Sequence, residues 1–122
     1  MRLKDPQLLR DKAYVNGEWV GADSGATFQV TNPATGAVLA TLPDMLEGET
    51  RRAIEAANAA WPLWAAKTAK ERAGIMRKWF DLQMANQEDL AVIMTSEHGK
   101  PLFEARGEVA YGASFVEWFA EE

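Results

Sequence analysis

Apolar residues in the first third of the chain recur at every second position, a pattern that predicts short β-strands. The dipeptide Asn16-Gly17 lies inside the first of these runs and tolerates the positive φ of a tight turn, so it predicts a hairpin. Two further alternating runs, residues 27–31 and 38–43, flank the turn-forming stretch NPATG. The sequence therefore predicts a β meander over residues 13–43.

From Glu47 onward the apolar spacing changes to the three- and four-residue period of a helix. The first helical run carries Ile54, Ala57, Trp61 and Trp64 at this spacing. Pro62 lies near its end and is expected to stop or kink the helix. Thr68 and Glu71 then form a capping box, which predicts the start of a second helix.

Two more helices complete the pattern. One begins at Gln87 and ends near Gly99, and the next opens at Pro101 and runs to Glu122. The last helix has no Gly, Asn or Pro stop signal, and acidic residues at a helix C-terminus are unfavourable. We therefore expect the chain to be truncated within its last helix. The predicted class is α+β, with an N-terminal β meander followed by about four helices.

The aromatic content also suggests an incomplete structure. Five Trp, five Phe and five Met residues are a large apolar load for one meander and four helices, so we expect exposed apolar surface. The length of 122 residues fits one ordinary domain. Residues 1–12 mix charge with two leucines and are predicted to be a leader or a short helix.

Charge and composition exclude several classes of function. The formal net charge is −5, with a pI near 4.9, which disfavours binding to nucleic acid or to anionic membrane surfaces. No apolar run reaches the ~7–15 residues of a secretory core or the ~18 residues of a membrane span. The absence of cysteine removes disulfides and thiolate chemistry from this segment and suits the reducing cytoplasm.

The titratable residues do not assemble a complete active site. His98 is the only histidine, and no serine lies in a G-x-S-x-G motif, so a catalytic triad is not predicted. Glu97 and His98 are neighbours and point in different directions on a helix, so no metal site is predicted. The acidic pairs Glu88-Asp89 and Glu121-Glu122 are expected on solvated faces or as helix caps.

One lysine is a candidate contact for an anion. Lys100 lies in the span EHGKP, just before the start of the last helix, where the helix dipole favours an anion. A simple turn between two helices, with a solvated lysine, is the alternative that the sequence favours. No glycine falls in a nucleotide-binding motif.

Several longer stretches, in their order along the chain, resemble the N-terminal part of the aldehyde dehydrogenase superfamily. They are VNGEWV at 15–20, VTNPATGAVLATLP at 30–43, AIEAANAAWPLWAAKTAKERAGIMRKWFDLQ at 53–83, EHGKPLFEARGE at 97–108 and SFVEWFAEE at 114–122. The last stretch is most similar to the succinate-semialdehyde dehydrogenases, because it has Trp118 and Phe119 where many relatives carry two tyrosines.

The resemblance implies an enzyme that oxidises succinic semialdehyde to succinate with NAD or NADP in the cytoplasm, as in the degradation of γ-aminobutyrate (GABA). Residues 13–122 would form the N-terminal portion of its α/β cofactor-binding domain, truncated in the last helix. The cysteine nucleophile, the glutamate base and the cofactor-binding residues would all lie beyond residue 122. No catalytic, cofactor-binding or metal-binding residue is therefore assigned to this chain, and the isolated chain is expected to be inactive.

By the same resemblance, Phe115 and Trp118 are candidate substrate-binding residues in the wall of an aldehyde tunnel. Their i, i+3 spacing places them on one helix face. Tyr111 is a weaker candidate one turn earlier. The alternative is that both residues are core, packed between the helix and a sheet. The expected partners are the remainder of the polypeptide, a small aldehyde, and further copies in a dimer or tetramer.

Two other functions stay open at this point. One is a self-standing, non-enzymatic helical module whose aromatic face docks a partner helix. The other is a different aldehyde dehydrogenase subfamily, such as a glutarate-semialdehyde dehydrogenase. A sharp two-state unfolding transition of the monomeric chain would favour the module.

Overall fold

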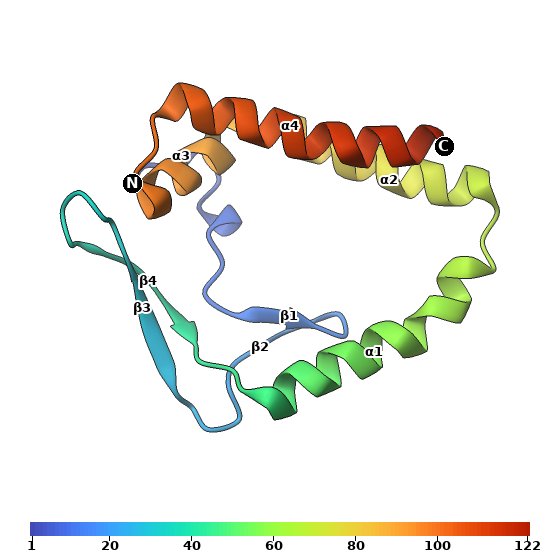
Figure 1. Cartoon of the computed structure of the whole chain (residues 1–122), viewed down its shortest axis with the longest axis horizontal. Helices are drawn as coiled ribbons and strands as arrows, with labels where there is room; N and C mark the ends of the chain where they lie inside the picture. Colours follow the sequence, from blue (N-terminus) through green and yellow to red (C-terminus); the bar gives the residue numbers. More distant parts are fainter. The chain divides into compact units, whose positions relative to one another are not determined.

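The computed structural model describes residues 1–122 and is an α+β structure, as predicted (Figure 1). The elements in chain order are η1 (Pro6–Leu8), β1 (Ala13–Val15), β2 (Glu18–Val20), β3 (Thr27–Thr31), β4 (Val38–Pro43), α1 (Glu47–Ala65), α2 (Ala69–Ala85), α3 (Gln87–His98) and α4 (Leu102–Glu121). The chain divides into two compact units. One comprises Leu9–Ala66, and the other comprises Met1–Leu8 together with Lys67–Glu122.

The first hairpin forms where the sequence predicts it. Asn16 and Gly17 adopt φ values of 50° and 85°, and β1 pairs antiparallel with β2. Tyr14 faces Trp19 across the pair, with ring centroids 5.1 Å apart, and the Arg10 guanidinium lies 4.7 Å from the Trp19 ring. These contacts stabilise a hairpin whose strands are only three residues long.

The second hairpin pairs β3 with β4 around the predicted NPATG turn. The Asn32 side chain accepts hydrogen bonds from the backbone N–H groups of Ala34 and Thr35, so it caps its own turn. The prediction of one continuous meander is wrong, because β2 and β3 do not pair and the strands form two separate sheets. In the connection between them, the Asp23 backbone N–H binds the carboxylate of Glu49, which draws the chain toward α1 instead of back along β2.

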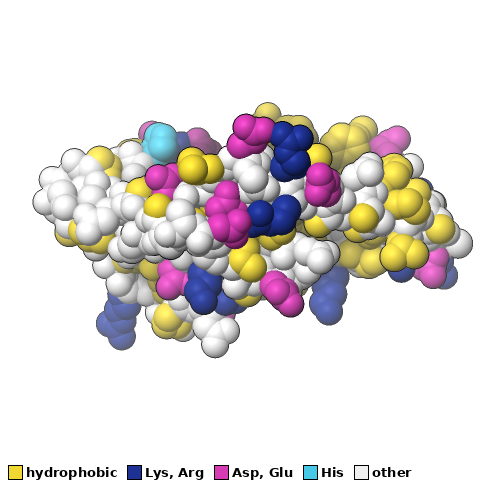
Figure 2. Space-filling model, turned by 90° about the horizontal axis from the view of Figure 1, so that it is seen from below, with side chains coloured by type: hydrophobic (Ala, Val, Ile, Leu, Met, Phe, Trp, Pro, Cys, Tyr) yellow, Lys and Arg dark blue, Asp and Glu magenta, His cyan; other side chains and the backbone are white.

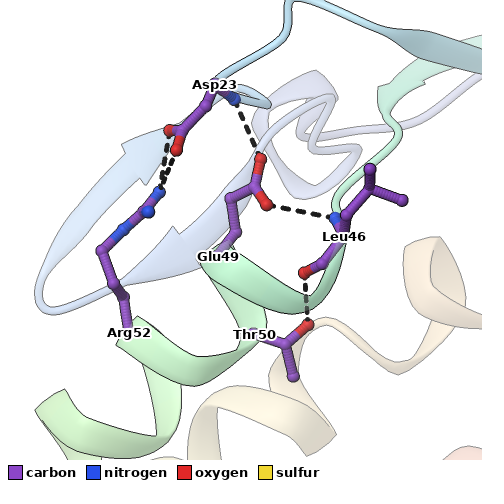
Figure 3. Close-up of polar contacts among 5 residues, drawn as sticks. All are labelled: Asp23, Leu46, Glu49, Thr50 and Arg52. Carbon is purple, nitrogen blue, oxygen red and sulfur yellow. Dashed lines mark hydrogen bonds and ion pairs between the residues drawn. The ribbon is translucent and has the colours of Figure 1, made fainter.

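Glu49 organises the start of α1 (Figure 3). Its buried carboxylate accepts the Leu46 backbone N–H at 3.2 Å and the Asp23 backbone N–H at 3.0 Å. Arg52, one turn on, donates two hydrogen bonds to the Asp23 carboxylate, at 2.7 and 2.8 Å. Pro62 lies inside α1, which continues to Ala65, so the proline does not stop the helix where it stands.

The second unit is built on three helices. The capping box at the start of α2 is confirmed, because Thr68 Oγ1 accepts the Glu71 N–H and Glu71 Oε2 accepts the Thr68 N–H at 2.8 Å. Helix α3 ends at Gly99, which adopts the left-handed conformation with φ 82°. Helix α4 then runs beside α2 and α3 (Figure 1).

The N-terminal residues form part of this helical unit. Asp89 of α3 is buried, and its two carboxylate oxygens accept the backbone N–H groups of Lys4 at 3.0 Å and Asp5 at 2.8 Å. Within residues 1–12, Pro6–Leu8 form the 3-10 helix η1. The expectation that Asp89 is solvated or only caps its own helix is wrong, because the carboxylate binds the N-terminal backbone, 84 and 85 residues away.

Only small side chains are fully covered in this structure. The buried apolar residues are Ala91, Ala105, Ala113 and Ala120, and no large apolar side chain is fully buried. Hydrophobic side chains lie open among charged ones on the face in Figure 2, and Trp19, Trp61, Trp79 and Trp118 are all exposed. The predicted exposure of apolar surface is confirmed. None of the helices combines the length and apolarity that crossing a membrane requires.

Candidate functional site: an aromatic groove along α4

Helix α4 is apolar on two opposite sides. Ala113 and Ala120 are buried on one side. A helix turns by about 100° per residue, so Tyr111, Phe115 and Trp118 fall on the side opposite these alanines. An interior helix covered on both sides has this pattern, whereas a surface helix has one apolar stripe. The aromatic side of α4 is therefore left uncovered by α2 and α3.

Phe115 and Trp118 lie together on the wall of an open groove of about 850 Å³. The lining residues are Arg77, Ser114, Phe115, Glu117, Trp118, Phe119, Glu121 and Glu122. Phe115 is 48% exposed and Trp118 is 62% exposed, so residues 1–122 do not enclose either ring. The structure thus brings the two candidate residues together, while their role as a tunnel wall stays a prediction.

Tyr111 extends the same aromatic stripe by one turn. Its ring meets the Phe115 ring edge to face, with centroids 4.9 Å apart and an interplanar angle of 83°. The Ser114 hydroxyl donates to the Tyr111 carbonyl at 2.7 Å, so this hydroxyl already has an acceptor within the helix. The rings of Tyr111 and Phe115 thus present a continuous aromatic surface on this side of α4.

The charged rim of the groove is acidic. Its one cation, Arg77, binds Glu117 at 2.7 Å and also pairs with Glu121. The hydrogen bond to Glu117, followed by the one to Glu121, raises the pKa of Arg77 above its usual value. Both carboxylates already engage Arg77. Since Glu122 adds a further negative charge, the rim is poorly suited to a substrate carboxylate. Sequence reasoning missed Arg77, whose partners are 40 and 44 residues away.

The environment of Lys100 matches neither a contact for an anion nor a solvated lysine, the two alternatives that the sequence offers. It lies in the turn between α3 and α4, as expected, but its Nζ pairs with Glu108 and its side chain is only 15% exposed. It is therefore neither a solvated lysine nor a free anion contact. The pairing reaches eight residues along the chain, beyond the one-turn spacing that helical patterns detect.

His98 and Glu88 do not line the groove. His98 is the exposed last residue of α3, and the structure contains no group of three or more His, Cys, Asp or Glu side chains able to hold a metal. Glu88 accepts two hydrogen bonds from Arg106, at 2.7 and 2.8 Å, and these lower the pKa of its carboxyl. The Arg106–Glu88 pair joins α4 to α3, and no second site forms around these residues.

Comparisons with known proteins agree with the fold. Residues 19–122 match the model of the aldehyde dehydrogenase family. The whole chain is 63% identical to a quarter of the glutarate-semialdehyde dehydrogenase of Pseudomonas putida, and 57% identical to a quarter of the NADP(+)-dependent succinate-semialdehyde dehydrogenase of Escherichia coli. The chain therefore spans about a quarter of the length of these curated relatives.

A solved structure gives the same result. The succinate-semialdehyde dehydrogenase of Burkholderia pseudomallei superimposes on 98% of this chain with a TM-score of 0.95 and 65% sequence identity. The superposition covers 25% of that enzyme. The helices and hairpins described above thus correspond to the N-terminal part of an aldehyde dehydrogenase fold.

Proposed function

Since the chain belongs to the aldehyde dehydrogenase family, we propose that it forms the N-terminal portion of the cofactor-binding domain of an NAD(P)-dependent semialdehyde dehydrogenase. The proposed reaction is the oxidation of succinic semialdehyde to succinate. Glutaric semialdehyde is the second candidate, because the Pseudomonas putida relative at 63% identity is named for it. The observation that carries the proposal is the match over the full chain to enzymes of both names.

The covalent chemistry belongs to the rest of the proposed enzyme. In the proposed enzyme, a cysteine thiolate would add to the aldehyde carbon, NAD(P) would supply the hydride acceptor for that carbon, and water would release the acid and free the thiolate. This chain has no cysteine to supply the thiolate. Its groove cation is bound to two carboxylates and Lys100 is bound to Glu108, so neither of these two cations is free to bind a dinucleotide phosphate. No cofactor contact is therefore assigned to residues 1–122.

The contribution of this chain to the proposed site is the aromatic side of α4. Phe115 and Trp118, extended by Tyr111, form an apolar wall that excludes water from the reacting aldehyde and shapes the channel. The acidic rim repels a substrate carboxylate, so that end of the substrate is held elsewhere in the enzyme. The aldehyde-bearing carbon chain, which is uncharged, is the part that passes this wall.

Family membership also supports two statements about the whole protein. We infer that it is a homo-oligomer, either a dimer or a tetramer. We also infer that it acts in the cytoplasm, because a sequence without cysteine suits a reducing compartment.

A pair of chimeras tests the proposed function. Residues 1–122 replace the matching quarter of the Escherichia coli succinate enzyme and of the Pseudomonas putida glutarate enzyme. Both chimeras should assemble and reduce NADP or NAD with a semialdehyde, followed by nicotinamide absorbance, while the isolated chain gives no turnover. Assembled chimeras that oxidise neither semialdehyde would contradict the proposal.

The substrate is tested by the ratio of kcat/KM for succinic and glutaric semialdehyde, with each unmodified parent as control. In the chimera with the Pseudomonas putida enzyme, residues 1–122 should raise kcat/KM for succinic semialdehyde relative to that for glutaric semialdehyde. The opposite result would identify glutaric semialdehyde as the substrate. In that case the kcat/KM ratio shifts toward glutaric semialdehyde in the Escherichia coli chimera and does not shift toward succinic semialdehyde in the Pseudomonas putida chimera.

A further inference from the structure

Arg77 connects α2 to the part of α4 that carries Trp118. Its Nη1 donates a hydrogen bond to Glu117 at 2.7 Å, and its Nη2 pairs with Glu121, one turn further along α4. Trp118 follows Glu117 directly, so its ring comes from the helical turn between the two carboxylates. Arg77 also lines the same groove as Trp118. One guanidinium therefore holds α4 at two points that enclose the turn bearing this ring.

The two carboxylates also determine how α4 is rotated about its own axis. At about 100° per residue, Glu117 and Glu121 lie about 40° apart, and Trp118 lies within about 100° of both. The buried residues in this half of α4 are the alanines Ala113 and Ala120. Since alanine has only a methyl group, these residues form low ridges that oppose sliding and rotation weakly. The ion pairs with Arg77 then decide the direction in which α4 presents its rings.

The guanidinium is itself held in place by α2. Its central carbon lies 5.4 Å from the centroid of the half-buried Phe80 ring. A planar guanidinium can bind two carboxylates and stack on a ring at the same time, which an ammonium group does not. The paired side chains are between 38% and 66% exposed, and ion pairs at such exposure contribute little to the free energy of unfolding. They are better suited to specifying the position of α4 than to stabilising the fold.

We propose that Arg77 is a positioning residue for the aldehyde channel. Its two ion pairs set the rotation of α4 and, with it, the place of the Phe115 and Trp118 rings in the channel wall. This inference rests on the proposed function, in which these rings contact the aldehyde. Arg77 acts through α4 and does not bind the substrate carboxylate, because its two ion pairs already occupy the guanidinium. A small displacement of a positioning surface is enough to lower the rate of a reaction.

The first test measures steady-state kinetics in the Escherichia coli chimera. Arg77→Met removes the charge and keeps an unbranched stem. It should lower kcat/KM for succinic semialdehyde about five- to tenfold. The fall for acetaldehyde should be less than about twofold, because this shorter aldehyde contacts less of the wall. Arg77→Lys keeps the charge without the planar fork and should recover only part of the loss.

The matched control is Arg106→Met. Arg106 also joins α4 to a neighbouring helix, through two hydrogen bonds to Glu88, and its side chain is 44% exposed against 38% for Arg77. It does not line the groove. Arg106→Met should therefore change the ratio of the two kcat/KM values by less than about twofold. Equal effects of Arg77→Met and Arg106→Met on this ratio would overturn the proposal.

A double substitution shows whether Arg77 acts through the ring of Trp118. In a Trp118→Ala background, Arg77→Met should lower kcat/KM by less than about twofold, because the ring that it positions is gone. An undiminished loss in that background would overturn the proposal. If the Arg77→Met chimera does not fold, replacing Glu117 and Glu121 together by alanine removes the same ion pairs and should reproduce the loss.

The second test requires no activity and uses the 122-residue chain labelled with 5-fluorotryptophan. Each of the five tryptophans gives one fluorine resonance, and Trp118→Phe and Trp61→Phe assign two of them. Arg77→Met should shift the Trp118 resonance and leave the Trp61 resonance in place, whereas Arg106→Met should leave both.

A Trp118 resonance that Arg77→Met does not move would overturn the proposal. An assembled chimera that oxidises neither semialdehyde would refute the proposed function alone. The fluorine spectrum is recorded without substrate, so it then still decides whether Arg77 positions the ring of Trp118.

Discussion

Replacing Trp118 by Ala in the Escherichia coli chimera probes the proposed wall of the aldehyde channel directly. The substitution removes the indole ring and leaves the buried alanine side of α4 unchanged, because Trp118 is on the opposite side of the helix. The packing of α4 on α2 should therefore survive, while the apolar surface offered to the aldehyde shrinks.

The magnitude follows from the exposed area of the ring. Trp118 is 62% exposed, so of a side-chain area of about 250 Å², about 155 Å² is open in residues 1–122. A four-carbon aldehyde that contacts one flank covers roughly a third of this, about 50 Å². At about 25 cal/mol per Å², the lost contact is worth about 1.3 kcal/mol, or roughly a tenfold fall in kcat/KM.

The assay is steady-state kinetics with succinic semialdehyde and with acetaldehyde, a shorter aldehyde that contacts less of the wall. The matched control is Trp61→Ala, because Trp61 is 61% exposed, belongs to the other compact unit and does not line the groove. The tenfold fall should appear for Trp118→Ala with succinic semialdehyde and be smaller with acetaldehyde. Equal effects of the two tryptophan substitutions would refute the assignment of Trp118 to the substrate.

Three further predictions concern stability and are measured on the 122-residue chain. Thr68→Ala removes the N-cap of α2 and should cost about 1 kcal/mol in urea unfolding followed by circular dichroism, whereas Thr68→Ser should keep most of it. The pKa of Glu49 is lowered, chiefly by the hydrogen bond from the Asp23 backbone, so its stabilising effect is complete above the ordinary glutamate pKa of about 4.3 and is lost as pH falls through the lower native value. Acid titration of the helical signal should therefore show a loss below about pH 4 that is smaller in Glu49→Gln; identical curves would refute this account. Ala105→Leu should destabilise α4 by about 1–3 kcal/mol because Ala105 is fully buried, while Ala59→Leu at an exposed position should change the urea midpoint little.

The elements that were predicted correctly depend on neighbouring residues. Asn16 and Gly17 both adopt positive φ, and this local preference specifies the turn. The capping box joins Thr68 to Glu71, three residues along the chain. Both signals can therefore be read from the sequence alone. The starts of the four helices, near Glu47, Thr68, Gln87 and Pro101, follow from local signals of the same kind. Phe115 and Trp118 were correctly placed on one face, because a helix has a fixed period.

The features that were missed depend on contacts distant in sequence. Nothing near Asp89 signals that it binds the backbone of Lys4 and Asp5, and nothing near Glu49 signals the Asp23 N–H. The separation of the strands into two sheets has the same cause, since the pairing choice after β2 is decided by a contact to α1. An acidic residue in the first turn of a helix is readily interpreted as a helix cap. The sequence then gives no sign that its carboxylate binds a group distant along the chain.

The two-sided apolar character of α4 has a consequence for biosynthesis. In relatives of full length, the matching segment is the N-terminal part and leaves the ribosome before the remaining three quarters of the polypeptide. At about 5–20 residues per second, translation leaves the aromatic side of α4 uncovered on the nascent chain for tens of seconds. Exposed tryptophan and phenylalanine are side chains that holdase chaperones bind, so folding of such a protein is expected to be sensitive to chaperone supply and to pauses in elongation shortly after this segment.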